Sequence, residues 1–141
     1  MRLFPQQWGQ QKPPVGTRLN RGHGLANGLV GRWLCNEGAG LWVNDSVGNK
    51  GGVHTGGPTW SAGQFGPALN FDGVDDYVDI PDAPSLSTGT TISLSVWFRL
   101  DSTTDVGFLI DKSNADITDG WTFQHSGQDL VFYRNNTNST T

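Results

Sequence analysis

The chain has 141 residues, of which 20 are glycine and 16% are charged, and its net charge is −4. This length suits a single domain, and many glycines together with six tryptophans favour short strands joined by tight turns. No apolar run reaches the ~20 residues of a membrane helix, and the first residues lack the apolar segment of a secretory signal, so we expect neither a membrane span nor a conventional leader.

Residues 1–27 have the composition of an extended arm. Three prolines and four glutamines oppose a helix, because proline lacks an N–H group and favours extended backbone. We predict that Phe4, Trp8, Arg18 and Arg21 dock the arm on a partner subunit, with its own domain as the alternative. The first 36 residues carry five bases and no acid, which is too sparse a charge to make nucleic acid an expected partner.

Alternation of apolar and polar residues predicts strands through the rest of the chain. The clearest pattern covers 91–100, and an Asp-Gly turn is expected just after 67–71. The predicted strands are 29–36, 59–61, 67–71, 76–80, 91–100, 106–111, 121–125 and 129–134. The predicted core, with Cys35 as a buried packing thiol, is Trp33, Cys35, Leu69, Phe71, Ile80, Ile92, Leu94, Val96, Phe98, Phe108, Ile110, Phe123 and Phe132.

Five segments of the chain follow one another in a distinctive order. They are GLVGRWLCNEGAG at 28–40, NDSVGN at 44–49, GPTW at 57–60, FDGVDDYVDIP at 71–81 and ISLSVW at 92–97. This order resembles the laminin-G-like jelly roll, a branch of the concanavalin A-like lectin/glucanase superfamily. The resemblance implies an all-β, antiparallel jelly-roll β-sandwich over 28–134, between the arm at 1–27 and a polar tail at 135–141.

The resemblance covers only about the first two-thirds of that fold. The late strands of the family, which include a Trp-x-His strand and an Asp-Glu-x-Arg strand, have no match in this sequence. We therefore expect a sandwich that lacks its C-terminal strands, so that either the native chain continues or a partner completes the fold. An open sheet edge left by missing strands needs cover.

The sequence offers no recognisable catalytic constellation. Asp75 and Asp76 are adjacent and suit a turn better than a pair of catalytic carboxylates, and the three histidines have no ligand spacing. We predict a protein that is not an enzyme. Calcium is the one cofactor with candidate ligands, either Asp45 with Asn49 or the loop at 111–120, but ordinary turn chemistry is the favoured interpretation of both loops.

Aromatic residues suggest a glycan platform. Trp97 lies on the polar side of its predicted strand, and Trp121 and Tyr133 belong to neighbouring predicted strands, so the three side chains are candidates to line a concave, sugar-binding sheet. The alternative is that they pack under a loop or a second layer, as large aromatic side chains usually do.

Two functional classes remain open. Residues 6–30 are similar to the leader of jelly-roll proteins encoded among bacteriophage virion genes, which implies a structural or decoration protein on a virion surface, docked through its arm on capsid or tail subunits. The alternative is a carbohydrate-binding module of a cell-surface or secreted protein, and glycan binding is compatible with both classes.

Overall fold

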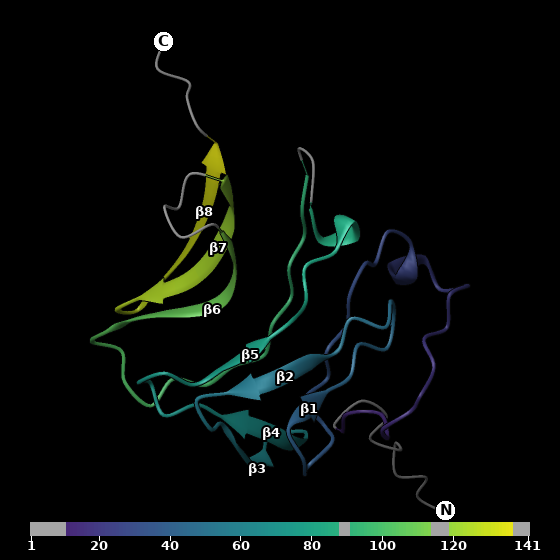
Figure 1. Ribbon diagram of the computed structural model, residues 1–141, viewed down its shortest axis with the longest axis horizontal. Helices are drawn as coiled ribbons and strands as arrows, with labels where there is room; N and C mark the ends of the chain where they lie inside the picture. The colour runs from purple at the N-terminus through teal and green to yellow at the C-terminus, as the bar shows by residue number, and fades with distance from the viewer. Residues whose placement is uncertain (1–10, 88–90, 114–118, 137–141) are drawn as a thin grey trace, which may run out of the picture. The chain divides into compact units, whose positions relative to one another are not determined.

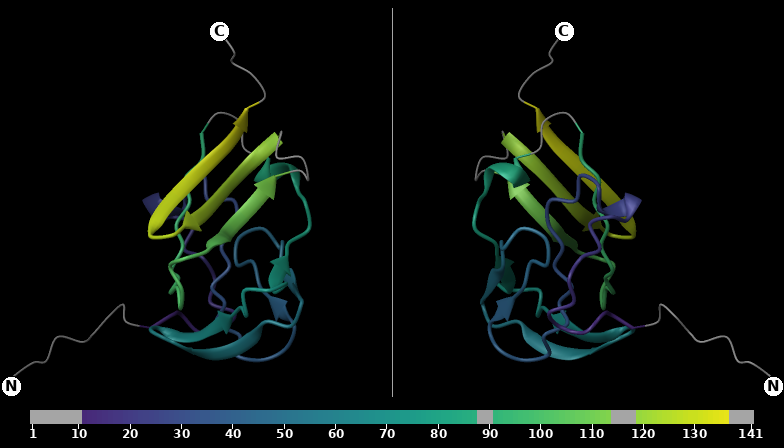
Figure 2. Two further views of the ribbon diagram at one scale, coloured as in Figure 1. Left: turned by 90° about the vertical axis from the view of Figure 1, so that its left-hand side faces the viewer. Right: turned by 90° about the vertical axis from the view of Figure 1, so that its right-hand side faces the viewer.

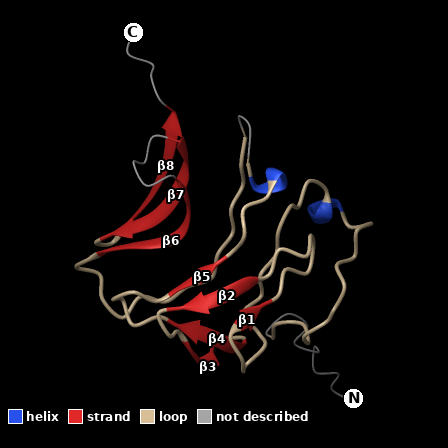
Figure 3. Ribbon diagram, viewed as in Figure 1, coloured by secondary structure: helices blue, strands red, loops and turns tan. Residues whose placement is uncertain are grey.

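The computed structural model describes residues 11–87, 91–113 and 119–136, and these form two compact units that divide after Leu86 (Figure 1). Every paired strand is antiparallel, and the only helical elements described are two single 3-10 turns, η1 (Gly24–Ala26) and η2 (Pro84–Leu86) (Figure 3). The predicted all-β class with antiparallel sheets is confirmed, whereas the jelly-roll arrangement stays a prediction.

The first unit contains two small sheets. One is a three-stranded sheet in the order β1-β2-β5, and the other is the β3–β4 hairpin. The strands are β1 (Trp42–Val43), β2 (Gly52–Thr55), β3 (Thr59–Gly63), β4 (Gly66–Asn70) and β5 (Tyr77–Asp79). Gln64 and Phe65 form the turn of the hairpin, and Gly66, directly after it, has a φ of 112°, which lies in a region that glycine adopts without steric cost.

Glycines let indole rings lie directly on the backbone of the first unit. A Cβ atom at Gly51 would overlap the ring of Trp42, and a Cβ atom at Gly31 would overlap the ring of Trp33. The Trp33 ring is further fixed by its Nε1–H, which donates to the carbonyl oxygen of Lys50 at 2.6 Å. These contacts explain why a glycine-rich sequence holds its tryptophans in defined places.

The second unit contains one three-stranded meander in the order β6-β7-β8. Its strands are β6 (Val106–Ser113), β7 (Asp119–Ser126) and β8 (Asp129–Asn136), and they lie side by side in one twisted sheet (Figure 2). β7 and β8 pair without interruption from Asp119↔Asn136 to Ser126↔Asp129, and the two residues between them form the turn. β6 carries a bulge between Phe108 and Ile110.

Two predicted strands are wrong. The segment 29–36 forms only an isolated bridge, Trp33↔Asp45, because Cys35 has a φ of 48° and the Arg32 amide donates to the side chain of Asp45. Residues 91–100 belong to no sheet that the described residues form. Burial still alternates there, with Ile92, Leu94 and Val96 more buried than their neighbours. Alternation predicts extended backbone, but a strand also needs a neighbour with which to form hydrogen bonds.

The predicted core is only partly formed. Val43, 1% exposed, is the one large apolar side chain that the described residues bury completely. Of the predicted core residues, Phe71, Phe98, Phe108 and Phe132 are between 41% and 63% exposed, and Cys35 is half-buried. Phe108 and Phe132 are exposed on opposite faces of the β6–β7–β8 sheet, which carries apolar side chains on both faces.

Candidate functional site

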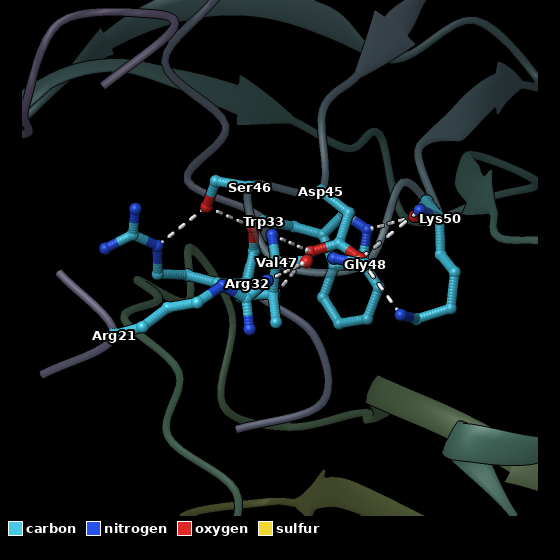
Figure 4. A network of polar contacts seen from close by, with 8 residues as sticks. All are labelled: Arg21, Arg32, Trp33, Asp45, Ser46, Val47, Gly48 and Lys50. Atoms are coloured by element: carbon cyan, nitrogen blue, oxygen red, sulfur yellow. Dashed lines mark hydrogen bonds and ion pairs between the residues drawn. The ribbon is translucent and has the colours of Figure 1, made fainter. Parts of the chain in front are cut away.

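The carboxylate of Asp45 organises the loop that follows β1. Its side chain is fully buried, and Oδ1 accepts hydrogen bonds from the amides of Arg32 (3.0 Å) and Val47 (2.8 Å) (Figure 4). Oδ2 accepts from the amides of Gly48 (2.9 Å) and Lys50 (3.2 Å), and Lys50 Nζ lies 3.2 Å from the same oxygen. Five N–H donors therefore surround one carboxylate.

These donors determine the direction in which the pKa of the Asp45 carboxyl group is shifted. Burial by itself raises the pKa of a carboxyl group, but the amides of Arg32, Val47 and Lys50 and the ammonium of Lys50 offset that effect, so the pKa of Asp45 lies below its ordinary value. Asn49, the other candidate calcium ligand, is exposed with a φ of 57°, which asparagine tolerates in turns. The geometry is turn chemistry rather than a cation cage, since the carboxylate lone pairs already face N–H groups.

A second acidic group lies in the turn before β5. Carboxylate oxygens of Asp72, Asp75 and Asp76 come within 4.8 Å of one another, and two of the three residues are exposed. Asp72 Oδ1 accepts from the amide of Val74 at 2.8 Å, and Asp76 Oδ2 accepts from the amide of Asp72 at 2.9 Å. The hydrogen bonds agree with the expected turn, and exposed carboxylates alone do not define a metal site.

The second predicted calcium loop, 111–120, lies partly outside the described residues. Asp111 Oδ1, at its beginning, accepts from Ser113 and from the hydroxyl of Thr122, at 2.8 and 2.6 Å. This carboxylate therefore also serves as a hydrogen-bond acceptor between β6 and β7.

The predicted glycan platform does not form as one surface. Trp121 pairs with Arg134 across β7 and β8, and Thr122 pairs with Tyr133, so Trp121 and Tyr133 lie on opposite faces of the sheet. Trp121 stacks on Phe132, with ring centroids 6.5 Å apart, whereas Trp97 is 82% exposed in the segment 91–100. The prediction failed because it assigned each strand separately and did not fix the cross-strand register.

The described part of the arm lies along its own unit. Lys12 Nζ donates to the carbonyl oxygens of Cys35 (2.9 Å) and Pro67 (2.6 Å), and Arg21 donates to the carbonyl oxygen of Val47 (2.8 Å). Arg18 is exposed, and Phe4 and Trp8 lie outside the described residues. Arg21 thus has an intramolecular role, while docking through Phe4, Trp8 and Arg18 stays a prediction.

Three residues of the first unit carry side chains that are common in catalytic sites. Glu37 accepts from the amides of Asn36 and Asn44, at 3.0 and 2.9 Å. Burial raises the pKa of the Cys35 thiol above its ordinary value; the charge of Lys12 lowers this pKa and the charge of Glu37 raises it further. The thiol is therefore a poor nucleophile at neutral pH. His54 is buried against Trp60, with ring centroids 5.4 Å apart, and its two ring nitrogens have no partner among the described residues.

The β6–β7–β8 sheet exposes large apolar side chains on both faces. Register places Val106, Phe108 and Tyr133 on one face, with exposed fractions of 60%, 63% and 49%. Leu130 and Phe132 lie on the other face and are 56% and 44% exposed. Sequence patterning identified these strands but assigned their phenylalanines to a core, because alternation cannot tell a covered face from an open one.

Comparisons with known proteins give no relative: no family model, no curated protein and no solved structure matches the chain. None of the helical turns in the described ranges has the length or apolar character to cross a bilayer.

Proposed function

We propose that this chain is a non-enzymatic structural and binding module of a protein assembly, and that its β6–β7–β8 sheet is the contact surface. The observation that carries the proposal is the exposure of large apolar side chains on both faces of one sheet. Large apolar side chains that are exposed together on one sheet are typical of interaction sites. Burial of this apolar surface against a partner stabilises the contact by roughly 25 cal/mol per Å² of area removed from water.

The edge of the sheet favours a further copy of the chain as the first partner. Within the described residues β8 pairs only with β7, so its outer N–H and C=O groups form an edge that accepts another strand. Two copies of β8 paired antiparallel about a twofold axis at Val131 would place Leu130 of each copy opposite Phe132 of the other. An isologous contact of this kind covers the same exposed side chains in both copies.

A virion surface is the assembly that the sequence resemblance favours. The proposal follows the similarity of residues 6–30 to the leaders of phage jelly-roll proteins, and capsid or tail subunits are then further partners. Lys12 and Arg21 hold the described part of the arm on its own unit, so we assign the contact between copies to the sheet, and docking on capsid or tail subunits through Phe4, Trp8 and Arg18 remains part of the proposal.

The alternative, a carbohydrate-binding module outside a cell, has less support. Trp121 and Tyr133 face opposite sides of the sheet, so the three-residue glycan platform is not available. Trp97 is 82% exposed, but one exposed tryptophan alone defines no sugar site.

Sedimentation velocity over a wide range of protein concentration tests the proposal. We expect the wild type to sediment as a dimer or larger species and Leu130→Glu to remain a monomer, since a charge at a buried contact lacks a partner. Val74→Glu is the matched control, because Val74 is 83% exposed and lies away from the sheet in sequence and in pairing. A wild type that is monomeric at every concentration, or equal effects of both variants, would contradict the proposal.

A further inference from the structure

One face of the β1-β2-β5 sheet presents an aromatic ring and a carboxylate in a single row. The three strands lie side by side (Figure 1), and their register places Trp42 opposite Val53 and Val53 opposite Asp79. The other face of the sheet carries Val43 and His54, which are buried. Trp42 and Val53 are 46% and 44% exposed, and Asp79 is exposed too. The row therefore lies on the open face of the sheet.

The indole ring of Trp42 is fixed in place although its surface is half open. The ring lies over Gly51, where a Cβ atom would overlap it, and its Nε1–H donates to Asn44 Oδ1 at 3.2 Å. Asn44 is held in turn by Glu37 Oε1, which accepts from the amide of Asn44 at 2.9 Å and from its Nδ2 at 3.0 Å. A ring that is already fixed loses little conformational freedom when a ligand binds, which favours binding.

The spacing of the row fits a planar cation. Neighbouring strands lie about 4.8 Å apart, so the backbones of Trp42 and Asp79 are separated by roughly 10 Å, with Val53 between them. A guanidinium group above Val53 can therefore stack on the indole ring and pair with the carboxylate. Tyr77, which is 53% exposed, lies on the same face two residues before Asp79 and adds aromatic surface beside the row.

The charges of this part of the chain attract cations. Between Glu37 and Leu86 the sequence has seven acids and one base, Lys50, which pairs with the buried Asp45. The strands β1, β2 and β5 contain no lysine or arginine that could compete for Asp79. An acidic surface with an exposed indole ring favours a cationic partner over a neutral or an anionic one.

We propose that this face binds an arginine side chain in a peptide segment of a partner protein. Arginine fits better than lysine, because its planar guanidinium stacks on an aromatic ring and pairs with a carboxylate through two hydrogen bonds. Val53 and Tyr77 supply apolar surface for the residues next to the arginine, so a peptide gains contacts that a free guanidinium ion lacks. The inference goes beyond the proposed assembly through β8, which belongs to the other unit, and does not depend on it.

Titration of the ¹⁵N-labelled full chain with the blocked peptide acetyl-Gly-Leu-Arg-Leu-Gly-amide tests the site. We expect saturable shifts of the Trp42 Nε1–H signal and of the Val53 and Asp79 amide signals. Citrulline keeps the planar shape of arginine without its charge, so the citrulline peptide should bind about fivefold more weakly. The lysine peptide should also bind more weakly than the arginine peptide, because its ammonium group is not planar.

Two variants of the row locate the contact. Trp42→Leu should weaken binding of the arginine peptide about fivefold. Asp79→Asn should weaken it about threefold and make it less sensitive to salt, since an exposed charge pair is screened. Asp79 is exposed, so this second variant keeps its fold and tests the site even where Trp42→Leu does not fold. Trp97→Leu and Asp129→Asn are the matched controls, because both residues are exposed and belong to the second unit.

Three results would overturn the inference. They are equal binding of the arginine peptide and either substituted peptide, equal losses in the variants and their controls, and the absence of any saturable shift. A shift of the Trp42 Nε1–H signal with protein concentration alone would show that a second copy of the chain covers this face, and would contradict the inference as well.

Discussion

Lys50 Nζ lies 3.2 Å from Asp45 Oδ2, and the side chains of the two residues are 12% and 0% exposed. The amides of Lys50, Gly48 and Val47 donate to the same carboxylate, so one buried charge fixes the whole loop after β1. Because the arm contacts this loop through Arg21 and Val47, the position of the arm depends on Asp45 as well.

Replacing this charge should destabilise the first unit. Asp45→Asn places an NH₂ group against N–H donors and leaves the Lys50 ammonium without its counter-ion, which costs about 3–5 kcal/mol of unfolding free energy for a buried pair. Hydrogen exchange at the amides of Val47, Gly48 and Lys50 should accelerate. Asp79→Asn, an exposed carboxylate on β5, is the control and should leave those rates unchanged; unchanged rates in Asp45→Asn would refute the role of Asp45.

The same residue predicts the response to acid. The pKa of Asp45 is lower in the folded than in the unfolded chain, so its contribution to stability is complete above its ordinary value of 3.8 and is lost as pH falls through the folded-state pKa. Urea unfolding at neutral pH and at pH values below 3.8 should show the difference between wild type and Asp45→Asn shrinking with acid. A difference independent of pH would show that the carboxylate charge contributes nothing.

Gly107 and His125 form a close contact across β6 and β7. A Cβ atom at Gly107 would overlap the imidazole ring of His125, which is 8% exposed. Gly107→Ala should therefore displace the ring and cost ~1–3 kcal/mol of unfolding free energy. In a double-mutant cycle with His125→Ala, the cost of Gly107→Ala should largely disappear; additive losses would mean that the ring is not the obstacle.

Burial separates two apolar residues that the sequence pattern treats alike. Val43→Ala should cost about 2 kcal/mol of unfolding free energy, because Val43 is 1% exposed. Phe98 is 41% exposed in the segment 91–100, so Phe98→Ala should cost only about 1 kcal/mol or less. Urea denaturation of both variants measures the difference. A larger loss of unfolding free energy in Phe98→Ala than in Val43→Ala would show that Phe98 belongs to the core.

Most strands that pair with a neighbour in sequence were predictable, although β1 and β2 were not. The β3–β4 hairpin and the β6–β7–β8 meander follow from alternation and short turns, because their hydrogen bonds are made locally along the chain. The pair β2–β5 joins strands with the whole β3–β4 hairpin between them, and β2 begins at a glycine, so alternation gave no signal for it. The pattern at 91–100 was the clearest of all, yet it carried no information about a partner strand.

The candidate sites likewise combine local features that the sequence predicts with long-range features that it does not. Turn chemistry around Asp72 and Asp45 was readable from residue types, because Asx side chains bond amides two or three positions away. The hydrogen bond from the Arg32 amide to Asp45 joins residues that are distant in sequence, so residue types alone do not predict it. That Trp121 and Tyr133 lie on opposite faces follows only from the register of β7 and β8. The row on the open face of the β1-β2-β5 sheet was not predicted either, because residue types do not show which positions of separate strands lie opposite one another.

Hydrogen exchange along β8 tests the central proposal most directly. At concentrations where the wild type is associated, the β8 amides that do not donate to β7 should become protected, and Leu130→Glu should remove that protection while leaving the β6–β7 ladder unchanged. Protection confined to β7, with β8 exchanging equally fast in associated and dissociated protein, would show that the sheet edge is not the assembly contact.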